Sequence, residues 1–246
     1  MKETITSLQN KIVKEVYSLK DNKNIKEKHM FLVETMHLVE MAKDNLEYVL
    51  TLNEIPSISC KQYIVNKEIL EKCSNNKSYS KVIGVVKQLE FEFVKDDTLI
   101  YLDNIQDPGN LGTILRTCLA LNIKNIIVSK DCCSIYNLKA IQSSEGALFK
   151  VNIKVGDISL LKNLKEEGYR IVSTSLSKDS ILLNNLEYKQ KTVFVFGNEG
   201  NGIRSSIIEL SDNKVIIPIN NIDSLNVGVS LGIVLYTYLF NIKSLK

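Results

Sequence analysis

Short apolar runs alternate with amphipathic stretches along almost the whole chain, and few folds accommodate such a pattern. Runs such as 98–102 (TLIYL) and 192–196 (TVFVF) have the length and the β-branched or aromatic content of buried strands. Between them, apolar residues recur at three- and four-residue spacing, as in 158–167, which predicts helices. Strands that alternate with helices favour a parallel sheet covered by helices on both faces. We therefore expect an α/β fold.

Two such alternations follow one another, separated by the charged segment 87–97 (KQLEFEFVKDD). The chain has 246 residues, enough for one large domain or two modest ones at roughly 150 residues per domain. This charged segment does not end in an apolar run that could enter a hydrophobic core. We therefore place the boundary between two domains there. The prediction is a small α/β domain over 1–95 and a larger parallel-sheet domain over 96–246.

The predicted elements of the first domain are helices at 7–20, 35–45 and 67–73, and strands at 31–33, 48–52, 62–65 and 82–86. Those of the second are helices at 111–121, 135–143, 158–167, 205–209 and 226–242, and strands at 98–102, 125–128, 151–155, 170–174, 192–196 and 214–217. Polar side chains at their starts can cap three of the helices; the candidates are Ser7, Asn110, and either Ser224 or Asn226.

Composition excludes several classes of protein. Hydrophobic residues make up 44% and charged residues 24%, near the averages for globular proteins, so extended disorder is excluded. The longest nearly apolar stretch, 228–240, is far shorter than the ~20 residues that span a bilayer. The polar start has no signal-peptide core, and the five cysteines form no CxxC pair. We expect a soluble cytoplasmic protein with reduced thiols and no metal site.

The first segment with chemical content is 103–117, DNIQDPGNLGTILRT, where a strand enters a loop rich in Asp, Gly and Asn before a helix begins. Arg116 lies about two turns into that helix and could bind a phosphate. A βα turn with a surface arginine would explain the same residues.

The second segment is 192–206, TVFVFGNEGNGIRSS, in which an apolar strand runs into Gly197, Gly200 and Gly202. The spacing GxxGxG is neither a dinucleotide fingerprint nor a P-loop. Glycines let a ligand approach the backbone, and strand ends in α/β sheets are where ligands bind. Glu199 lies within this turn, although a glycine-rich helix entry without a ligand is the alternative.

The third segment, 215–240, is a strand that ends at Pro218, a polar loop, and an apolar helix whose first turns carry Gly228, Ser230 and Gly232. Small residues permit close approach by another backbone or a ligand. A C-terminal core helix accounts for much of the apolar face in either case.

In combination these segments resemble the signature motifs of the SpoU/TrmH family of SPOUT methyltransferases. The matches are N-x-x-D-P-G-N-x-G-x-x-x-R-T at 104–117, F-G-N-E-G-x-G at 196–202, and I-P-I…S-L-N-V-x-V-S at 217–230. A weaker match, ITSLQNKIVK at 5–14 and FLVE at 31–34, resembles the family's L30e-like substrate-binding domain. The family usually has Gly where this chain has Thr35.

The resemblance implies an S-adenosylmethionine-dependent RNA ribose 2′-O-methyltransferase, a homodimer whose parallel sheet ends in a C-terminal trefoil knot. The catalytic positions it implies are Asn110, Arg116, Glu199, Ser224 and Asn226. The cofactor positions are Thr174, Gly197, Gly202, Ile217, Pro218, Leu225 and again Asn226. The implied chemistry needs no metal, because the sulfonium leaving group carries its own driving force.

Arginine is a very weak base, with a pKa above about 12. Arg116 therefore either acts as base with help from a neighbouring phosphate or holds that phosphate and stabilises the developing alkoxide. RNA contacts are expected from the segment 11–28, where six lysines face three acidic residues. These are Lys11, Lys14, Lys20, Lys23, Lys26 and Lys28, together with residues around Lys139. A solvated helix face remains the alternative.

Ribosomal RNA is the favoured substrate, with the large subunit preferred, because the family's tRNA enzymes usually lack an L30e-like domain. Three alternatives remain: a tRNA ribose methyltransferase, an rRNA methyltransferase that confers antibiotic resistance, and a catalytically silent RNA-binding or ribosome-assembly factor. The intact set of catalytic residue types argues against the last. No membrane or DNA partner is expected.

Overall fold

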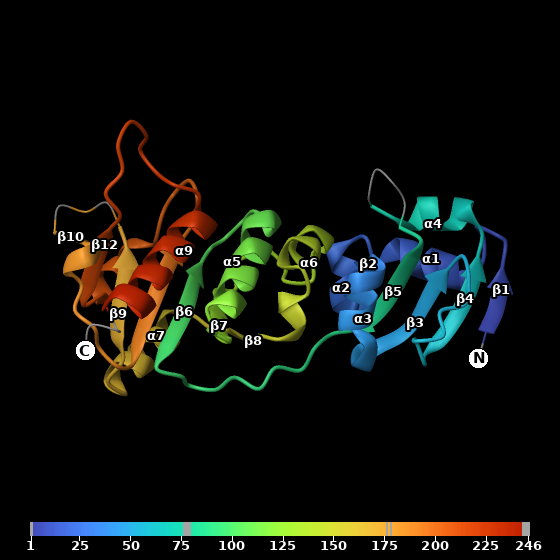
Figure 1. The fold of residues 1–246 in the computed structure, drawn as a ribbon, viewed down its shortest axis with the longest axis horizontal. Helices are drawn as coiled ribbons and strands as arrows, with labels where there is room; N and C mark the ends of the chain where they lie inside the picture. The colour runs from blue at the N-terminus through green and yellow to red at the C-terminus, as the bar shows by residue number, and fades with distance from the viewer. Residues whose placement is uncertain (1, 76–79, 176, 178, 243–246) are drawn as a thin grey trace. The chain divides into compact units, whose positions relative to one another are not determined.

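The computed structural model describes residues 2–75, 80–175, 177 and 179–242 (Figure 1). By its contacts the chain divides into two compact units. The first combines 1–90 with 134–149, and the second combines 91–133 with 150–246. Segment 134–149 thus belongs by its contacts to the first unit, a placement that local sequence pattern does not encode. Each unit is described separately below.

The first unit contains a five-stranded mixed sheet in the order β1-β4-β3-β5-β2. Its strands are β1 (Lys2–Ile5), β2 (Met30–Glu34), β3 (Leu46–Thr51), β4 (Lys61–Val65) and β5 (Val82–Lys87). The pairs β1/β4 and β3/β4 are parallel, whereas β5 runs antiparallel to both β2 and β3. The sequence predicted a parallel sheet for the larger domain and only an α/β fold for this one, whose sheet is mixed. Strand β1 was not predicted, because three of the four residues in its KETI sequence are polar.

The helices of the first unit are α1 (Lys11–Ser18), α2 (Asn22–Lys28), α3 (Met36–Met41), α4 (Lys67–Cys73) and α6 (Leu138–Ser144). Asn10, rather than Ser7, caps α1 by accepting a hydrogen bond from the Ile12 amide at 2.8 Å. Helix α2 escaped prediction because its NKNIKEK sequence buries a single apolar residue, Ile25. Segment 134–149 is anchored by Tyr136, whose ring centroid lies 4.7 Å from that of the buried Phe31.

Thr35 explains why glycine is usual at its position. It has φ 87° and ψ 146°, a region of backbone conformation that β-branched residues rarely adopt, at a cost of about 1–3 kcal/mol. Its side chain caps α3 by accepting from the Leu38 amide at 3.4 Å. The same turn thus contains both a strained backbone and a weak compensating hydrogen bond.

Thr35→Gly is expected to raise the free energy of unfolding by about 1 kcal/mol. Glycine relieves the backbone strain, and this gain exceeds two losses: the hydrogen bond of the cap and the greater conformational entropy of the unfolded chain. Urea titration of the whole chain measures the change. Thr35→Ala is the control, because it removes the cap and keeps the strain, and it should destabilise the protein. Equal destabilisation by both substitutions would contradict this account.

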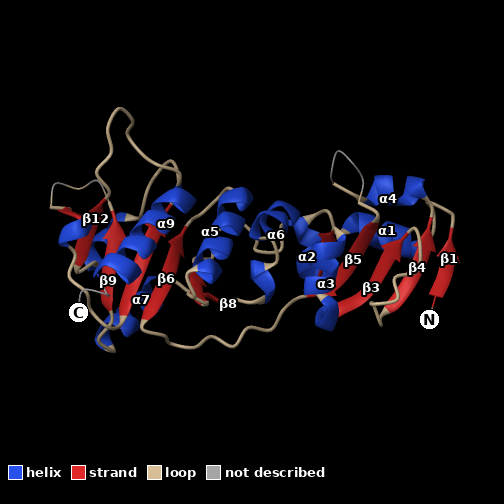
Figure 2. Ribbon diagram, in the orientation of Figure 1, coloured by secondary structure: helices blue, strands red, loops and turns tan. Residues whose placement is uncertain are grey.

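The second unit contains a seven-stranded sheet in the order β10-β12-β9-β11-β6-β7-β8 (Figure 2). Every pairing in it is parallel, as predicted. The strands are β6 (Thr98–Asp103), β7 (Asn125–Val128), β8 (Asn152–Val155), β9 (Arg170–Thr174), β10 (Ile181–Leu182), β11 (Thr192–Gly197) and β12 (Asn213–Ile216). The two-residue strand β10 carried too little pattern to be predicted.

Alternate side chains of these strands form two apolar layers. On one face, Leu99, Tyr101 and Val193 pack with α7 (Ile158–Glu166) and α8 (Ser205–Leu210). On the other, α9 (Val227–Tyr236) contacts β11 and lies along α5 (Pro108–Ala120), and Figure 1 shows these two helices together in front of the sheet. The second unit thus has the helix-covered parallel sheet that the sequence predicted.

Helices α5 and α9 pack closely because α9 presents glycines to α5. A Cβ atom added at Gly228 would lie 3.1 Å from Thr113 Cγ2, and one added at Gly232 would lie 3.6 Å from Thr117 Cγ2. The small residues of the third segment therefore accommodate a neighbouring helix. After Tyr236 the chain continues as a π-helical segment, Thr237–Ile242. Among the described residues, no helix is long and apolar enough to cross a membrane.

Candidate functional site

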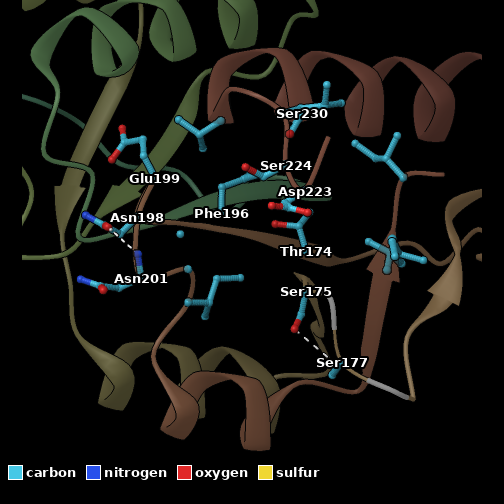
Figure 3. Close-up of a pocket in the computed structure, with 18 of the residues that line it drawn as sticks. Thr174, Ser175, Ser177, Phe196, Asn198, Glu199, Asn201, Asp223, Ser224 and Ser230 are labelled. Atoms are coloured by element: carbon cyan, nitrogen blue, oxygen red, sulfur yellow. Dashed lines mark hydrogen bonds between the residues drawn. The ribbon is translucent and has the colours of Figure 1, made fainter. Parts of the chain in front are cut away.

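A cavity of about 610 Å³ opens at the carboxyl ends of the strands of the second unit. Its walls come from the end of β9, the loop after β11, and the loop between β12 and α9 (Figure 3). Carboxyl ends of parallel strands meet at one edge of a sheet, so segments far apart in the sequence converge there. Of the residues assigned to a site from the sequence, the lining includes Thr174, Gly197, Glu199, Gly202, Ile217, Ser224 and Leu225.

The loop after β11 is a tight turn that depends on glycine. A Cβ atom on Gly197 would overlap the carbonyl carbon of Gly202 and lie 2.5 Å from the Ile203 amide nitrogen. Gly202 has φ 69°, a left-handed conformation suited to glycine. Asn198 closes the turn, because its Oδ1 accepts from the amides of Gly200 and Asn201 at 2.8 and 2.9 Å. The glycines therefore let the backbone of this turn line the cavity directly, beside the side chains of Asn198, Glu199 and Asn201.

One chain of hydrogen bonds joins all three sequence segments. Asn226 Nδ2 donates to Asn110 Oδ1 at 2.8 Å, and Asn110 Nδ2 donates to Glu199 Oε1 at 2.8 Å. Asn226 also caps α9 by accepting from the Gly228 amide at 2.9 Å. Helix α5 is capped by Asp107, not by Asn110 as predicted, which leaves the Asn110 side chain free to bridge. Asn110 and Asn226 thus contact the cavity wall through Glu199.

Arg116 lies apart from this network. Its side chain is exposed on α5, on the side that also carries Thr113 and Ala120, and it is not among the residues that line the cavity. Pro218 is also outside the lining, although its neighbours Ile217 and Ile219 are within it. The six lysines of 11–28 belong to the first unit, and all but Lys20 are exposed.

The site also contains an ion network that sequence reasoning missed. Asp103, fully buried at the end of β6, accepts from Arg204 Nε at 2.7 Å and from the Arg204 amide at 2.8 Å. Arg204 Nη1 lies 3.1 Å from Asp131 Oδ2. The Asp103 carboxylate raises the pKa of the Arg204 guanidinium. Because Arg204 directly follows the glycine turn, this network fixes that turn to the ends of β6 and β7.

The scarcity of arginine, three in the chain, was the available signal for this network. Nothing in the local sequence indicated that Arg204 would face a buried carboxylate, because the two residues are 101 positions apart. Cys132 adds a further link, since its sulfur accepts from the Ile105 amide at 3.2 Å. Burial raises the pKa of the neighbouring Cys133 thiol to about 12, which agrees with a structural role for this pair of cysteines.

Arg204→Ala is expected to lower the free energy of unfolding by about 3 kcal/mol, because it leaves the Asp103 carboxylate buried without its partner. Denaturant titration measures this loss. Asp131→Ala removes only the exposed half of the network and should cost less than about 1 kcal/mol. Similar losses for the two variants would mean that the buried ion pair contributes no more than the exposed one.

A parallel sheet with a cavity of mixed polar and apolar lining at its carboxyl edge is the arrangement of an α/β enzyme. Residues 97–236 match the family described as SpoU rRNA Methylase. The chain therefore belongs to the SpoU rRNA methylase family, as its signature motifs had indicated.

Individual relatives cover the chain to different extents. The 23S rRNA (guanosine(2553)-2′-O)-methyltransferase of Bacillus subtilis is 26% identical over 94% of this chain and 97% of its own length. The tRNA (guanosine(18)-2′-O)-methyltransferase of Aquifex aeolicus is 32% identical but covers 57% of this chain and 67% of its own. The crystal structure of an rRNA methyltransferase from Sinorhizobium meliloti superposes with a TM-score of 0.87 at 24% identity, over 98% of both chains. That likeness establishes the fold of both units.

Proposed function

We propose that the protein transfers a methyl group from S-adenosylmethionine to a ribose 2′-hydroxyl of RNA. The observation that carries this proposal is the hydrogen-bonded chain from Asn226 through Asn110 to Glu199, which joins the three family motifs at one cavity. The named relatives, which are RNA 2′-O-methyltransferases, support the same chemistry.

The cavity fits S-adenosylmethionine in size and in wall chemistry. At about 610 Å³ it lies in the range of roughly 300–1,000 Å³ typical of small-molecule sites. The backbone at Thr174, Gly197, Ile217 and Leu225 would hold the cofactor, with Gly202 and Pro218 shaping the loops. When bound, S-adenosylmethionine supplies an electrophilic methyl group on a sulfonium.

The chain's own residues must align a ribose hydroxyl and manage its proton. Glu199 presents its carboxylate at the cavity wall with Asn110 fixed against it. Ser224 lies on the same wall and adds a hydroxyl group. We assign to Arg116 the binding of the phosphate next to the target ribose and the stabilisation of the developing alkoxide.

We also infer that the chain acts as a homodimer through α9. Three apolar side chains of α9, Val229, Ile233 and Tyr236, and Phe240 of the π-helical segment after it, follow helical spacing and are 37–56% exposed. A contiguous exposed apolar stripe marks an interaction site, and a two-fold dimer pairs one such stripe with its copy. A second copy placed there would also approach the exposed Arg116 on the adjacent α5.

Ile233→Asp is expected to convert the dimer into a monomer, because it places a carboxylate in the apolar stripe. Sedimentation velocity measures the change in mass. Val155→Asp is the matched control, since Val155 is 66% exposed but lies outside α9. A wild-type chain that sediments as a monomer at micromolar concentration would refute the dimer.

We propose further that the C-terminal part forms a trefoil knot and that the first unit is an L30e-like RNA-binding domain. Strand order supports the knot: β12 lies between β9 and β10, although it follows both in sequence, and the chain then returns to pack α9 on β11. The lysines of 11–28 and Lys139, all in the first unit, support a role of that unit in RNA binding.

Ribosomal RNA of the large subunit is the substrate we favour, because the named 23S rRNA enzyme matches almost the whole chain, whereas the named tRNA enzyme matches little more than half. The test incubates the protein with methyl-labelled S-adenosylmethionine and unmodified large rRNA, small rRNA and tRNA. We expect alkali-stable label in large rRNA. Label in tRNA alone would overturn the choice of ribosomal RNA as the substrate, but it would still support ribose methylation. The same incubation is repeated with ribosomal particles. If neither RNA nor particles become labelled although the protein binds S-adenosylmethionine, the result would favour the catalytically silent RNA-binding factor.

A further inference from the structure

A second cavity, of about 240 Å³, lies within the first unit. Its polar lining includes the hydroxyl-bearing Tyr136, two ammonium groups and four carboxamides, the last six from Lys20, Asn22, Asn75, Asn137, Lys139 and Gln142. No carboxylate is among the described residues that line it. The cavity is therefore suited to an anionic ligand that also offers hydrogen-bond donors and acceptors.

Lys20 is held rigidly at the wall of this cavity. Its Nζ donates to the carbonyl oxygens of Lys72 and Ser74, both at 2.8 Å. Partial burial lowers the pKa of Lys20. Since its side chain is already ordered by these two bonds, binding of an anion there would cost little additional conformational entropy.

Two of the carboxamides, those of Asn22 and Asn75, have unused hydrogen-bonding capacity. The side chains of Asn22 and Asn75 make no hydrogen bonds with other residues that the structure describes. A carboxamide offers a donor and an acceptor side by side, the pattern with which proteins recognise the edges of nucleobases. The buried side chains of Leu19, Ile25 and Leu32 complete the wall with an apolar surface against which a flat ring can lie.

An aromatic ring stands next to the fixed lysine. Tyr17 is 49% exposed, and the Nζ atoms of Lys20 and Lys72 lie 5.1 and 5.6 Å from its ring centroid. Exposed aromatic rings beside basic groups are typical of surfaces that bind single-stranded nucleic acid. The cavity volume, below the roughly 300 Å³ at which drug-sized sites begin, suits one nucleotide rather than a larger ligand.

We propose that this cavity binds one unpaired nucleotide of the RNA, with the base against the carboxamides and the phosphate against Lys20 and Lys139. The proposal rests on the proposed function in that RNA is the substrate, but the site is separate from the methyl-transfer cavity. Recognition of an unpaired nucleotide by base-edge contacts would make the first unit a sequence-reading domain rather than only a basic surface.

The test measures the dissociation constant for large rRNA by gel shift, so that it does not depend on methyl transfer. Lys139→Glu and Asn22→Asp each introduce a negative charge into the lining and should weaken binding about tenfold, the loss of one charge-assisted hydrogen bond. Lys43→Glu is the matched control, because Lys43 is exposed in the same unit but does not line the cavity. It should weaken binding no more than about twofold.

Equal weakening by Lys139→Glu, Asn22→Asp and Lys43→Glu would overturn the proposal in favour of general electrostatic attraction. A second measurement follows nucleoside 5′-monophosphates by NMR titration after S-adenosylhomocysteine has been added to occupy the first cavity. Loss of mononucleotide binding in the two lining variants, with unchanged affinity for RNA, would assign the site to free nucleotides and overturn the RNA assignment. Thermal unfolding of every variant identifies any that fails to fold, and Asn22→Asp at the start of α2 should keep the helix intact.

The methylation assay separates this proposal from the proposed function. If the two lining variants raise KM for RNA while kcat at saturating RNA stays near the wild-type value, both proposals are supported. If the wild-type chain methylates no RNA but still binds it in a manner that depends on Lys139 and Asn22, the nucleotide site stands and the methyltransferase assignment fails.

Discussion

Arg116→Ala is expected to lower kcat for methyl transfer by about 10²- to 10³-fold, the effect of removing one group that stabilises developing negative charge. The affinity for S-adenosylmethionine should stay within about twofold of the wild-type value, because Arg116 does not line the cavity. Stability should also be unchanged, since the side chain is exposed. Single-turnover kinetics with saturating RNA measure the chemical step, and calorimetry measures cofactor binding.

Arg116→Lys and Lys162→Ala are the controls for this prediction. Arg116→Lys keeps the charge but loses the planar pair of donors that grips a phosphate, so an intermediate rate is expected. Lys162→Ala removes an exposed cation from α7 of the same unit and should not change the rate. A wild-type rate for Arg116→Ala would remove Arg116 from the catalytic assignment and leave the family membership untouched.

Gly197→Ala is expected to abolish detectable binding of S-adenosylmethionine and to lower the free energy of unfolding by about 3 kcal/mol. The added methyl group would overlap the backbone of Gly202 and Ile203, and backbone cannot move aside as a flexible side chain can. The turn would have to open, and the hydrogen bonds that Asn198 makes to Gly200 and Asn201 would be lost with it.

Gly200→Ala is the matched control within the same turn. A Cβ atom at Gly200 would meet only the Asn198 side chain, at 3.5 Å, which is ordinary van der Waals contact. Cofactor binding and stability should therefore stay close to the wild-type values. If calorimetry showed that Gly197→Ala binds the cofactor as well as Gly200→Ala does, the cavity at this turn would not be the cofactor site.

Segments with a strong apolar pattern were predictable from the sequence, and polar ones were not. Strands such as 125–128 and 170–174 and helix 67–73 have the predicted bounds, because their apolar content decides both their conformation and their burial. Strand β1 and helix α2 were missed because tertiary contacts stabilise them rather than their own patterns. The antiparallel position of β5 was missed for a related reason: alternation along the chain says little about the direction in which neighbouring strands pair.

The candidate site was predictable where residues share a loop and unpredictable where they meet across the sheet. The turn at 197–202 could be predicted from the spacing of its glycines. Where two stretches of backbone approach each other closely, the residue at the contact must be glycine. The partnership of Arg204 with Asp103 depends on strands β6 and β11 being neighbours, which no local pattern records. The capping of α5 follows the same rule: Asn110 was the predicted cap, but it lies inside a helix that Asp107 caps, and its side chain bonds to Glu199 instead.

The hydrogen-bonded chain at the cavity has a direction that both of its ends impose. A carboxylate only accepts hydrogen bonds, so Glu199 must receive the NH₂ group of Asn110, whose oxygen must then receive the NH₂ group of Asn226. The oxygen of Asn226 is thereby left to face the first amides of α9. The backbone amides of α9 can only donate, so they impose the same orientation on Asn226 from the other end of the chain. Both asparagines are thus held in one of their two flipped orientations by a carboxylate at one end and by helix amides at the other. Neutralising the carboxylate, as in Glu199→Gln, should therefore keep the order of donors and acceptors, because the amides of α9 still require it and a carboxamide oxygen can accept from Asn110.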